Sequence, residues 1–469
     1  MYEIQKTPNI LVVGDFMIDH YLWGGCERIS PEAPVQVVDI KNETMTLGGA
    51  GNVVLNLLAL GAKVDVATVL GDDETSKKII KILKKLKINT EFIEYESARK
   101  TSIKTRIMAS HQQIIRFDKE SKENIPQDAE DKLKTKIFNN IKKYDAVLLS
   151  DYAKGVLTKS LTKAIIKEAN KNNIFVLVDP KGADYSKYFG ATLLTPNKKE
   201  ASVASNIDIK NEDTLLEAIK KLKKDINLKY SIITLSEDGV AIYDEKFTKI
   251  PTIAREVYDV TGAGDTVLAA IGVGLSLGYD IFKSIHFATS AAAVVVAKLG
   301  SATASIEEII QYEKRINQDK FEEKIVTCNE LKNLLSKTPK KLVFTNGCFD
   351  ILHVGHIKYL QKAKELGDIL IVGLNSDSSV KKLKGENRPI NNEKDRAILL
   401  SALAFVDFVV IFDEETPYNL IKNLKPNILV KGADYQKKDV IGSDLVDEVV
   451  LIEYIAGKST TETINRIKQ

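Results

Sequence analysis

The chain has 469 residues, more than one hydrophobic core normally serves, so we expect at least two domains. Hydrophobic residues make up 44% and charged residues 28%, which provides material for full cores and excludes intrinsic disorder. Lys and Arg number 67 against 64 Asp and Glu, and a net charge of +3 gives no electrostatic reason to expect a nucleic acid partner. Small-molecule chemistry is therefore favoured.

The cysteines and the apolar stretches indicate a cytoplasmic protein that does not enter a membrane. Cys26, Cys328 and Cys348 are scattered and show no CxxC spacing, which fits a reducing compartment and argues against a disulfide framework. The N-terminal stretch MYEIQKTPNILVVGD has no long apolar signal segment. The apolar stretches 267–279 and 284–297 are too short to cross a bilayer.

From the N-terminus to about residue 300, short β-branched runs alternate with helical patterns. Each run ends in Gly, Asp, Asn or Pro before a new helix begins. This pattern predicts an α/β fold with buried parallel strands and ligand-binding loops at their carboxyl ends. The runs are NILVVGD, KVDVATVLG, YDAVLLSDY, NIFVLVDP, ATLLTPN and YSIITLSEDG.

A charged, helix-prone stretch without strands follows, and a second series of strands begins at residue 341. The runs KLVFTNG, DILIVGLNSD, DFVVIFD, NILVKGAD and EVVLIEYI predict a smaller five-stranded parallel sheet. We therefore predict a first domain over 1–315, a linker over 316–338 and a second domain over 339–469.

The first domain contains an anion-binding loop in DVTGAGDT, residues 259–266. Gly262 and Gly264, with Ala263 between them, let backbone N–H groups turn inward at the start of an apolar helix, whose dipole favours negative charge. Asp265 is then placed to accept a proton from an attacking hydroxyl group. The alternative is an ordinary turn in which Asp265 only caps the helix.

A second glycine-rich stretch, LGGAGNVVLNLLALGA, precedes another apolar helix. Gly48 and Gly49 would allow a polyol to approach the backbone closely, and Asn52 would contact its hydroxyl groups. Asp19, just after the first strand, is a further candidate for sugar hydroxyls.

These two stretches resemble the two signatures of the ribokinase family of sugar kinases, in the same order, over roughly residues 1–312. The resemblance implies a mostly parallel sheet flanked by helices and a small β lid over the sugar. RISPEAPVQVVDI, residues 28–40, is the lid candidate, because Pro31 and Pro34 break any helix and the rest alternates.

The same resemblance assigns nucleotide and metal contacts. Asn197 and Glu200 in TPNKKE look like the N-x-x-E element, which holds Mg²⁺ and the phosphates of ATP through water. On their own these two residues would be surface residues at a helix start. Ser236 and Gly239 in TLSEDG resemble the nucleotide-side loop, although Ser236 stands where many members have Gly.

In the second domain, TNGCFDILHVGHIKYL places His353 and His356 at the start of a helix that follows a strand ending near Gly347. Two imidazoles there can donate hydrogen bonds to phosphates and stabilise a leaving pyrophosphate. Three alternatives are histidines with a purely structural role, a zinc site that includes Cys348, and a coincidental spacing.

His353-Val354-Gly355-His356 resembles the HxGH signature of the cytidylyltransferase-like nucleotidyltransferases, over about residues 340–469. Lys431 would stabilise charge at the reacting phosphates. AGKSTT near the C-terminus is not a P-loop, because Ile452 occupies the position of a required Gly. The remaining nucleotide contacts that the resemblance implies are Asn375, Asp377, Arg388, Ser459, Thr460 and Thr461.

The fusion of these two domains resembles the bifunctional enzymes that make ADP-heptose for lipopolysaccharide. The resemblance implies ATP-dependent phosphorylation of D-glycero-β-D-manno-heptose 7-phosphate at C1, and AMP transfer from ATP to heptose 1-phosphate. A separate phosphatase would have to remove the 7-phosphate between the two steps. The sequence does not rank the basic residues that would hold this phosphate, namely Arg106, Arg116, Lys154 and Lys181.

Three other interpretations stay open at this stage. The chain could join a different sugar or polyol kinase to a cytidylyl- or adenylyltransferase. Its first domain could bind sugar without catalysis, or both domains could bind nucleotides only as sensors. Because lids in this kinase family often pair, we also expect a homodimer through the first domain.

Overall fold

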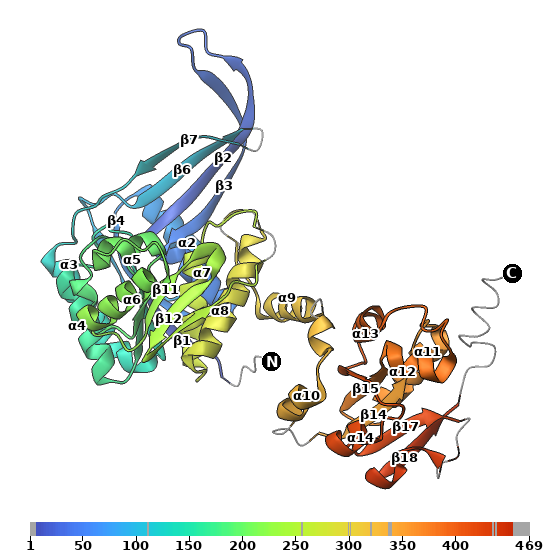
Figure 1. Ribbon diagram of the computed structural model, residues 1–469. Helices are drawn as coiled ribbons and strands as arrows, with labels where there is room; N and C mark the ends of the chain where they lie inside the picture. Colours follow the sequence, from blue (N-terminus) through green and yellow to red (C-terminus); the bar gives the residue numbers. More distant parts are fainter. Residues whose placement is uncertain are drawn as a thin grey trace. The chain divides into compact units, whose positions relative to one another are not determined.

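The computed structural model describes residues 6–109, 112–254, 257–298, 300, 302–318, 321–335, 340–433, 436 and 439–453. The chain divides into two compact units, Met1–Glu313 and Lys314–Gln469 (Figure 1). Helix α9 (Ile306–Gln318) spans this division. The helix α10 (Cys328–Leu335), within the segment predicted as a linker, belongs to the second unit, where its Leu331 is fully buried.

Unit 1 is built on a six-stranded sheet in the order β10-β9-β8-β1-β4-β5, in which all neighbouring pairs are parallel. Its central strands are buried on both faces, which explains their nearly continuous apolar sequences. The parallel α/β fold expected from the sequence is therefore confirmed. The strands are β1 (Asn9–Gly14), β4 (Lys63–Gly71), β5 (Ile93–Glu96), β8 (Ala146–Ser150), β9 (Phe175–Asp179) and β10 (Leu193–Leu194).

Helices cover both faces of this sheet (Figure 1). The apolar helices α7 and α8 pack so closely that a Cβ added at Gly274 would lie 2.7 Å from the hydroxyl oxygen of Ser284. None of the described helices is long and apolar enough to cross a membrane. The helices of unit 1 before α9 are α1 (Ala50–Ala59), α2 (Glu74–Lys85), α3 (Gln127–Asn140), α4 (Lys159–Lys171), α5 (Lys198–Ser205), α6 (Glu212–Ile226), α7 (Ala263–Ser276) and α8 (Ile281–Val296).

The last predicted strand of the first series differs from expectation. Strand β11 (Ser231–Thr234) does not join a parallel ladder of the main sheet but pairs antiparallel with β12 (Val240–Asp244), which in turn pairs with β13 (Lys246–Ile250). The turn between β11 and β12 contains Gly239 with φ of 88°, a backbone conformation that favours glycine and reverses the chain here.

A four-stranded sheet, which we call the lid, projects from unit 1 in the order β3-β2-β6-β7 (Figure 1). Strand β6 pairs with β2 only as far as Gly24, so that the rest of β2 and β3 continues as a two-stranded ribbon. The predicted lid segment 28–40 is the tip of this ribbon. The strands are β2 (Phe16–Ile29), β3 (Gln36–Gly49), β6 (Ser102–Ala109) and β7 (Gln112–Lys119).

Unit 2 contains the predicted five-stranded parallel sheet, in the order β16-β15-β14-β17-β18. The strand order reverses between β14 and β17, and ligands of such sheets bind at the carboxyl ends of the strands beside that point. The strands are β14 (Leu342–Gly347), β15 (Ile369–Asn375), β16 (Phe408–Phe412), β17 (Ile428–Gly432) and β18 (Glu448–Ile452). The helices after α10 are α11 (Val354–Lys364), α12 (Asp377–Lys384), α13 (Glu393–Ser401) and α14 (Tyr418–Leu424).

Candidate active sites

The candidate site of unit 1 is centred on the N-terminus of α7. Gly262 precedes this helix with φ of 81°, and a Cβ there would lie 2.7 Å from the side-chain nitrogen of Asn52. Helix α7 starts at Ala263, and Asp265 lies in its first turn. A Cβ at Gly264 would meet no atom within 4 Å, so this side of the loop is open. The loop therefore has the geometry of an anion site at a helix N-terminus.

Asp265 is buried, and its carboxylate accepts hydrogen bonds from two side chains. The Asn52 amide donates to it at 2.7 Å, and the Tyr152 hydroxyl donates at 3.1 Å. Burial raises the pKa of Asp265 to about 6, although these hydrogen bonds act in the opposite direction. A carboxylate with a pKa close to neutral is suited to accept and release a proton as a general base.

The loop that carries Tyr152 is held by Asp15. One carboxylate oxygen of Asp15 accepts from the backbone N–H groups of Tyr152 and Lys154 at 2.9 and 3.0 Å, and the other accepts from Val156 at 3.1 Å. Sequence reasoning missed both Asp15 and Tyr152. The sequence did offer a signal, since each of these residues follows a predicted parallel strand. Because β1 and β8 are neighbours, they end at the same edge of the sheet and bring the two residues together there.

The predicted sugar-binding residues of the lid lie near Asp265. Asp19 on β2 forms an ion pair with Arg106 on β6 at 2.6 Å, and its charge raises the pKa of Asp265. A Cβ at Gly48 would lie 2.2 Å from a carboxylate oxygen of Asp19. Gly49 follows with φ of 59°. The structure thus brings Asp19, the glycine pair and the proposed base together.

Asn197 and Glu200 form a capping box at the start of α5. The Asn197 side chain accepts from the Glu200 N–H at 2.9 Å, and the Glu200 carboxylate accepts from the Asn197 N–H at 3.1 Å. Lys181 also forms an ion pair with Glu200 at 2.8 Å. These contacts account for Asn197 and Glu200 as capping residues at the start of α5. Their role in binding Mg²⁺ through water stays a prediction.

Asp179, at the end of β9, is a further acidic residue of this region that sequence reasoning missed. Burial and the charges of Asp265 and Glu200 raise its pKa. Within the described part of the chain, no three His, Cys, Asp or Glu residues are grouped so that they could hold a metal ion directly. Asp179 therefore lies close enough to Asp265 and Glu200 to feel their charges, but these described residues do not form a preformed metal cage.

The predicted nucleotide loop at Ser236 and Gly239 is the turn between β11 and β12. Ser236 is exposed and has φ of 54°. A Cβ at Gly239 would lie 2.1 Å from the carbonyl oxygen of Ile250, so a glycine is required by the fold itself. Their contact with a nucleotide stays a prediction.

The candidate site of unit 2 contains the two histidines. His353 precedes α11 as its N-cap residue, and its ring stacks on that of His356 with 3.9 Å between the ring centroids. Burial and the neighbouring His353 lower the pKa of His356 to about 4, whereas a hydrogen bond with the backbone of Ile351 acts in the opposite direction. The His356 ring is therefore neutral at pH 7 without ligand, and a bound triphosphate would favour its protonated form.

Arg388, a predicted phosphate contact, is oriented by the buried carboxylate of Asp350. The Arg388 Nε donates to one Asp350 oxygen at 2.5 Å, while the backbone N–H groups of Ile390 and Asn391 donate to the other at 2.7 and 2.9 Å. Burial acts to raise the pKa of Asp350, but these partners hold it below its usual value. Asp350 thereby fixes the loop that carries Arg388.

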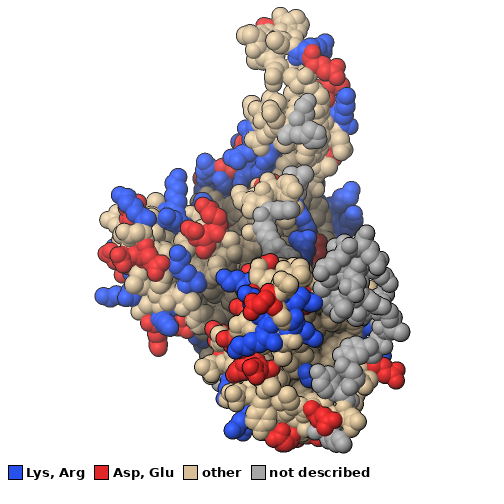
Figure 2. Space-filling model, turned by 45° about the vertical axis from the view of Figure 1, so that its right-hand side comes forward, with Lys and Arg blue, Asp and Glu red and all other residues tan. Residues whose placement is uncertain are grey.

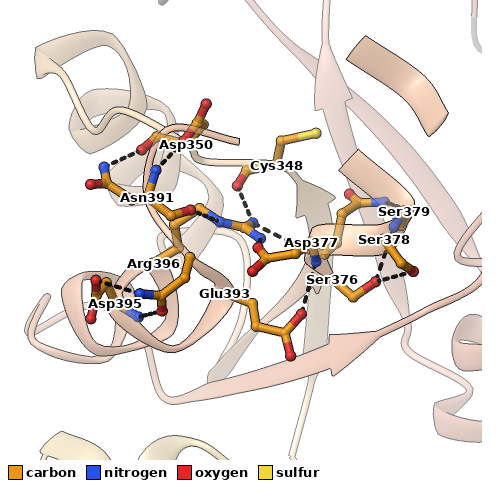
Figure 3. A network of polar contacts seen from close by, with 12 residues as sticks. Cys348, Asp350, Ser376, Asp377, Ser378, Ser379, Asn391, Glu393, Asp395 and Arg396 are labelled. Carbon is orange, nitrogen blue, oxygen red and sulfur yellow. Dashed lines mark hydrogen bonds and ion pairs between the residues drawn. The ribbon is translucent and has the colours of Figure 1, made fainter. Parts of the chain in front are cut away.

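Arg396 on α13 connects the other segments of this site (Figure 3). It is fully buried, and its guanidinium group donates to a carboxylate oxygen of Asp377 at 2.6 Å. It also donates to three backbone carbonyl oxygens, those of Cys348, Asn375 and Asn391, at 2.7, 2.8 and 3.0 Å. One side chain thus joins the ends of β14 and β15, and sequence reasoning missed it.

The structure describes only some of the remaining predicted site residues of unit 2. Lys431 lies on β17, the neighbour of β14, near the same carboxyl edge of the sheet as the histidines. Asn375 ends β15 and donates to the Ser379 hydroxyl at 3.0 Å. The three predicted hydroxyl donors at 459–461 lie outside the described residues; they are Ser459, Thr460 and Thr461.

Comparisons with known proteins agree with this division of the chain. The family of pfkB carbohydrate kinases matches residues 7–309, and the cytidylyltransferase-like family matches residues 344–462. Fold and sites therefore define a sugar kinase joined to a nucleotidyltransferase.

Relatives with both parts are similar over their whole length. The bifunctional protein HldE of Campylobacter concisus is 61% identical over 464 residues, covering 99% of this chain and 98% of that protein. The bifunctional protein HldE of Aliarcobacter butzleri is 57% identical over 469 residues, covering 99% and 98%. The chain belongs to the family of bifunctional HldE proteins, and the resemblance stated from the sequence is confirmed.

Solved structures are similar to unit 1 in fold. A ribokinase from Arabidopsis thaliana, complexed with ribose and ATP, has a TM-score of 0.52 at 20% identity and covers 66% of this chain and 99% of its own. Phosphofructokinase-2 from Escherichia coli has a TM-score of 0.55 at 17% identity and covers 66% and 100%. The ribokinase-like fold of unit 1 is thus confirmed.

Proposed function

We propose that unit 1 phosphorylates D-glycero-β-D-manno-heptose 7-phosphate at C1 with ATP, and that unit 2 transfers AMP from ATP to heptose 1-phosphate. The products are the 1,7-bisphosphate in the first reaction and ADP-heptose with pyrophosphate in the second, for the core of lipopolysaccharide. The observation that carries the kinase half is the buried carboxylate of Asp265 beside an open helix N-terminus.

In the kinase reaction, Asp265 accepts the proton of the C1 hydroxyl while the hydroxyl oxygen attacks the γ-phosphorus of ATP in line and ADP leaves. Backbone N–H groups at the start of α7 stabilise the negative charge on the transferred group. Asn52 keeps the carboxylate of Asp265 in place. Mg²⁺, held through water by Asn197 and Glu200, would neutralise charge on the phosphates of ATP.

In the adenylyl transfer, a phosphate oxygen of heptose 1-phosphate attacks the α-phosphorus in line, and pyrophosphate leaves. No enzyme nucleophile is required, so the protein contributes position and charge. His353 and His356 donate hydrogen bonds to the phosphates, and Lys431 and Arg388 add positive charge. The nucleotide itself would contact Asn375 and Asp377 at the end of β15.

The protein should be incubated with ATP, Mg²⁺ and a panel of sugar phosphates, and the products identified by mass. We expect a bisphosphate from heptose 7-phosphate, and ADP-heptose with pyrophosphate from heptose 1-phosphate. A first domain that only binds sugar would give ADP-heptose but no bisphosphate. A nucleotide sensor would give neither product, and a different preferred sugar would replace the heptose assignment.

A homodimer through the lid is part of this proposal. Leu22, Ile107 and Ile115 are aligned across β2, β6 and β7, so their side chains share one face, and Phe117 lies two residues further along β7. Ile115 and Phe117 are both 52% exposed. Among the described residues, no third strand pairs with the ribbon beyond Gly24, and isolated two-stranded ribbons are marginally stable in water.

The tip of the lid, at the top of Figure 2, exposes the apolar side chains of Ile29 and Val35 beside the charged residues Arg28 and Glu32. A second copy of the lid would cover such a surface. Light scattering should give the mass of two chains for the wild type and of one chain for the double variant Ile115→Glu with Phe117→Glu. A monomeric wild type at micromolar concentration would exclude the homodimer.

The remaining partners follow from the chemistry. We propose a cytoplasmic enzyme whose partners are small sugar phosphates, without nucleic acid or membrane, and whose pathway includes a separate bisphosphate phosphatase. Acidic and basic side chains alternate over the face shown in Figure 2, which fits this choice.

A further inference from the structure

One face of the lid carries a row of charged side chains. Lys104 on β6 is aligned with Asp19 on β2 and with Asp118 on β7, so all three side chains lie on the same face. Both carboxylates nevertheless bind arginines. Asp19 binds Arg106 at 2.6 Å, and Asp118 binds Arg116 at 3.1 Å. Lys104 is thus flanked by two acidic residues that are already paired.

The side-chain amine of Lys104 makes no hydrogen bond or ion pair with the described residues, although the side chain is half-buried. Burial lowers the pKa of Lys104, and so do the neighbouring charges of Lys154 and Arg116, while Asp19 and Asp118 act in the opposite direction. A partly desolvated cation that lacks a hydrogen-bond acceptor is unfavourable. Its position therefore suits an anion that is supplied from outside.

The direction of this side chain links it to the proposed base. The Lys104 Nζ lies 5.4 Å from the centre of the Tyr152 ring, and the hydroxyl of that ring donates to Asp265. Tyr152 thus contacts both Lys104, which belongs to the lid, and Asp265, which belongs to the start of α7. A ligand that reaches both would carry a hydroxyl group at one end and an anion at the other.

We propose that Lys104 binds the phosphate group that the sugar already carries when it enters unit 1, and thereby selects phosphorylated sugars. This inference rests on the kinase function proposed above. Lys104 is favoured over the four cations that the sequence suggested for this phosphate, because each of those four has an acidic partner within the protein. Those cations are Arg106 with Asp19, Arg116 with Asp118, Lys154 with Glu120, and Lys181 with Glu200.

A rival role for Lys104 is to stabilise the phosphoryl group during transfer. The two roles differ in their dependence on the substrate. A lysine that acts on the transferred group affects phosphorylated and unphosphorylated sugars equally. A lysine that binds the existing phosphate affects only the sugar that carries one.

The kinase should be assayed with heptose 7-phosphate and with unphosphorylated heptose, using the full chain and its variants Lys104→Gln and Lys104→Arg. For Lys104→Gln we expect kcat/KM with the 7-phosphate to fall about 10- to 100-fold, mainly through KM, since one charge-assisted hydrogen bond is lost. The charge of Lys104 also lowers the pKa of Asp265, so the assays are run at pH 8, well above the Asp265 pKa of about 6. Activity with unphosphorylated heptose should then stay unchanged, and Lys104→Arg should retain part of the preference. Lys41→Gln, at an exposed position of β3, is the matched control.

Thermal unfolding gives a readout that does not depend on catalysis. Without ligand, Lys104→Gln should unfold at the same temperature as the wild type or a higher one, because an unpaired cation is removed. Inorganic phosphate and heptose 7-phosphate should raise the unfolding temperature of the wild type more than that of Lys104→Gln.

Equal losses with both sugars, or an unchanged response to phosphate in Lys104→Gln, would overturn the assignment of Lys104. A lower unfolding temperature of the ligand-free variant would show a structural role instead. If the wild type phosphorylates no sugar, the kinase proposal fails, and the response to inorganic phosphate still decides whether Lys104 binds this anion.

Discussion

Tyr152 donates its phenolic hydroxyl to both carboxylate oxygens of Asp265, at 3.1 and 3.3 Å. The two residues are 113 positions apart in the sequence and come from the loop after β8 and from the start of α7. Burial and the charge of Asp265 raise the pKa of the Tyr152 hydroxyl, so it stays protonated and acts only as a donor. Tyr152 therefore stabilises the ionised form of the proposed base.

The pH dependence of the kinase should report this contact. Since the base must be ionised, kcat/KM should fall as the pH drops below about 6, the pKa of Asp265. In Tyr152→Phe the pKa rises, because a hydrogen bond that lowers it is removed, and the acidic limb of the profile should move to higher pH. Tyr144→Phe is the control, as that hydroxyl donates to Asp65 instead. An unmoved limb in Tyr152→Phe would contradict this role.

The two activities should separate by point mutation. Asp265→Asn keeps the shape of the side chain but removes the base, so kinase activity should fall on the order of a hundredfold or more while adenylyl transfer is unchanged. His356→Ala should have the opposite effect. Both rates are measured on the same preparations of full-length protein. Loss of both reactions from either substitution, in a protein that remains folded, would disprove two independent sites.

His356 should be neutral in the free protein and gain a proton when nucleotide binds. Its pKa of about 4 lies below the ordinary value of a histidine, so its NMR signal should not titrate between pH 6 and 8. ATP brings negative charge next to the ring, which favours the imidazolium form, and the midpoint should then move upward. A midpoint near 6.5 in the free protein would show that burial does not control this group.

Much of the fold could be predicted because its central strands are buried on both faces. Apolar runs such as those of β1, β8 and β15 predict buried parallel strands without tertiary information. The lid was predicted only at its tip. Strand β7 is exposed along its whole length, so its sequence QQIIRFDK does not show the apolar pattern by which a buried strand is identified.

The residues of the candidate sites also differ in whether the sequence alone could identify them. Asp265 and His356 lie in short local signatures, and the structure places them at helix starts as expected, while their catalytic roles remain predictions. Tyr152 and Arg396 lie outside those signatures. Their importance depends on partners distant in sequence, such as Asp265 for Tyr152 and Cys348 for Arg396, and no local pattern encodes such contacts.

Arg396 should be essential for the stability of unit 2. Arg396→Met removes a buried donor and leaves the carbonyl oxygens of Cys348 and Asn375 unsatisfied, which should cost about 3 kcal/mol or more of unfolding free energy. We expect adenylyltransferase activity to be lost at a lower temperature than in the wild type. Kinase activity should survive heating as before. Lys394→Met, at an exposed position of the same helix, should leave both unchanged. Equal heat resistance of Arg396→Met would disprove the role of this network.

The two proposed reactions do not connect directly, because unit 1 makes a 1,7-bisphosphate and unit 2 needs a 1-phosphate. The sequence contains no Asp-x-Asp phosphatase loop after any strand, and the segment between about 313 and 338 is too short for another catalytic domain. The chemistry of unit 2 releases pyrophosphate and does not hydrolyse a phosphate monoester.

The purified protein, given only ATP, Mg²⁺ and heptose 7-phosphate, should therefore accumulate the bisphosphate and stop. Mass spectrometry of the products over time measures this directly. Addition of a separate heptose bisphosphate phosphatase should start formation of ADP-heptose, and heptose 1-phosphate added alone should give it without phosphatase. ADP-heptose from heptose 7-phosphate in a preparation free of phosphatase activity would contradict the proposed order, because unit 2 would then have to accept another substrate.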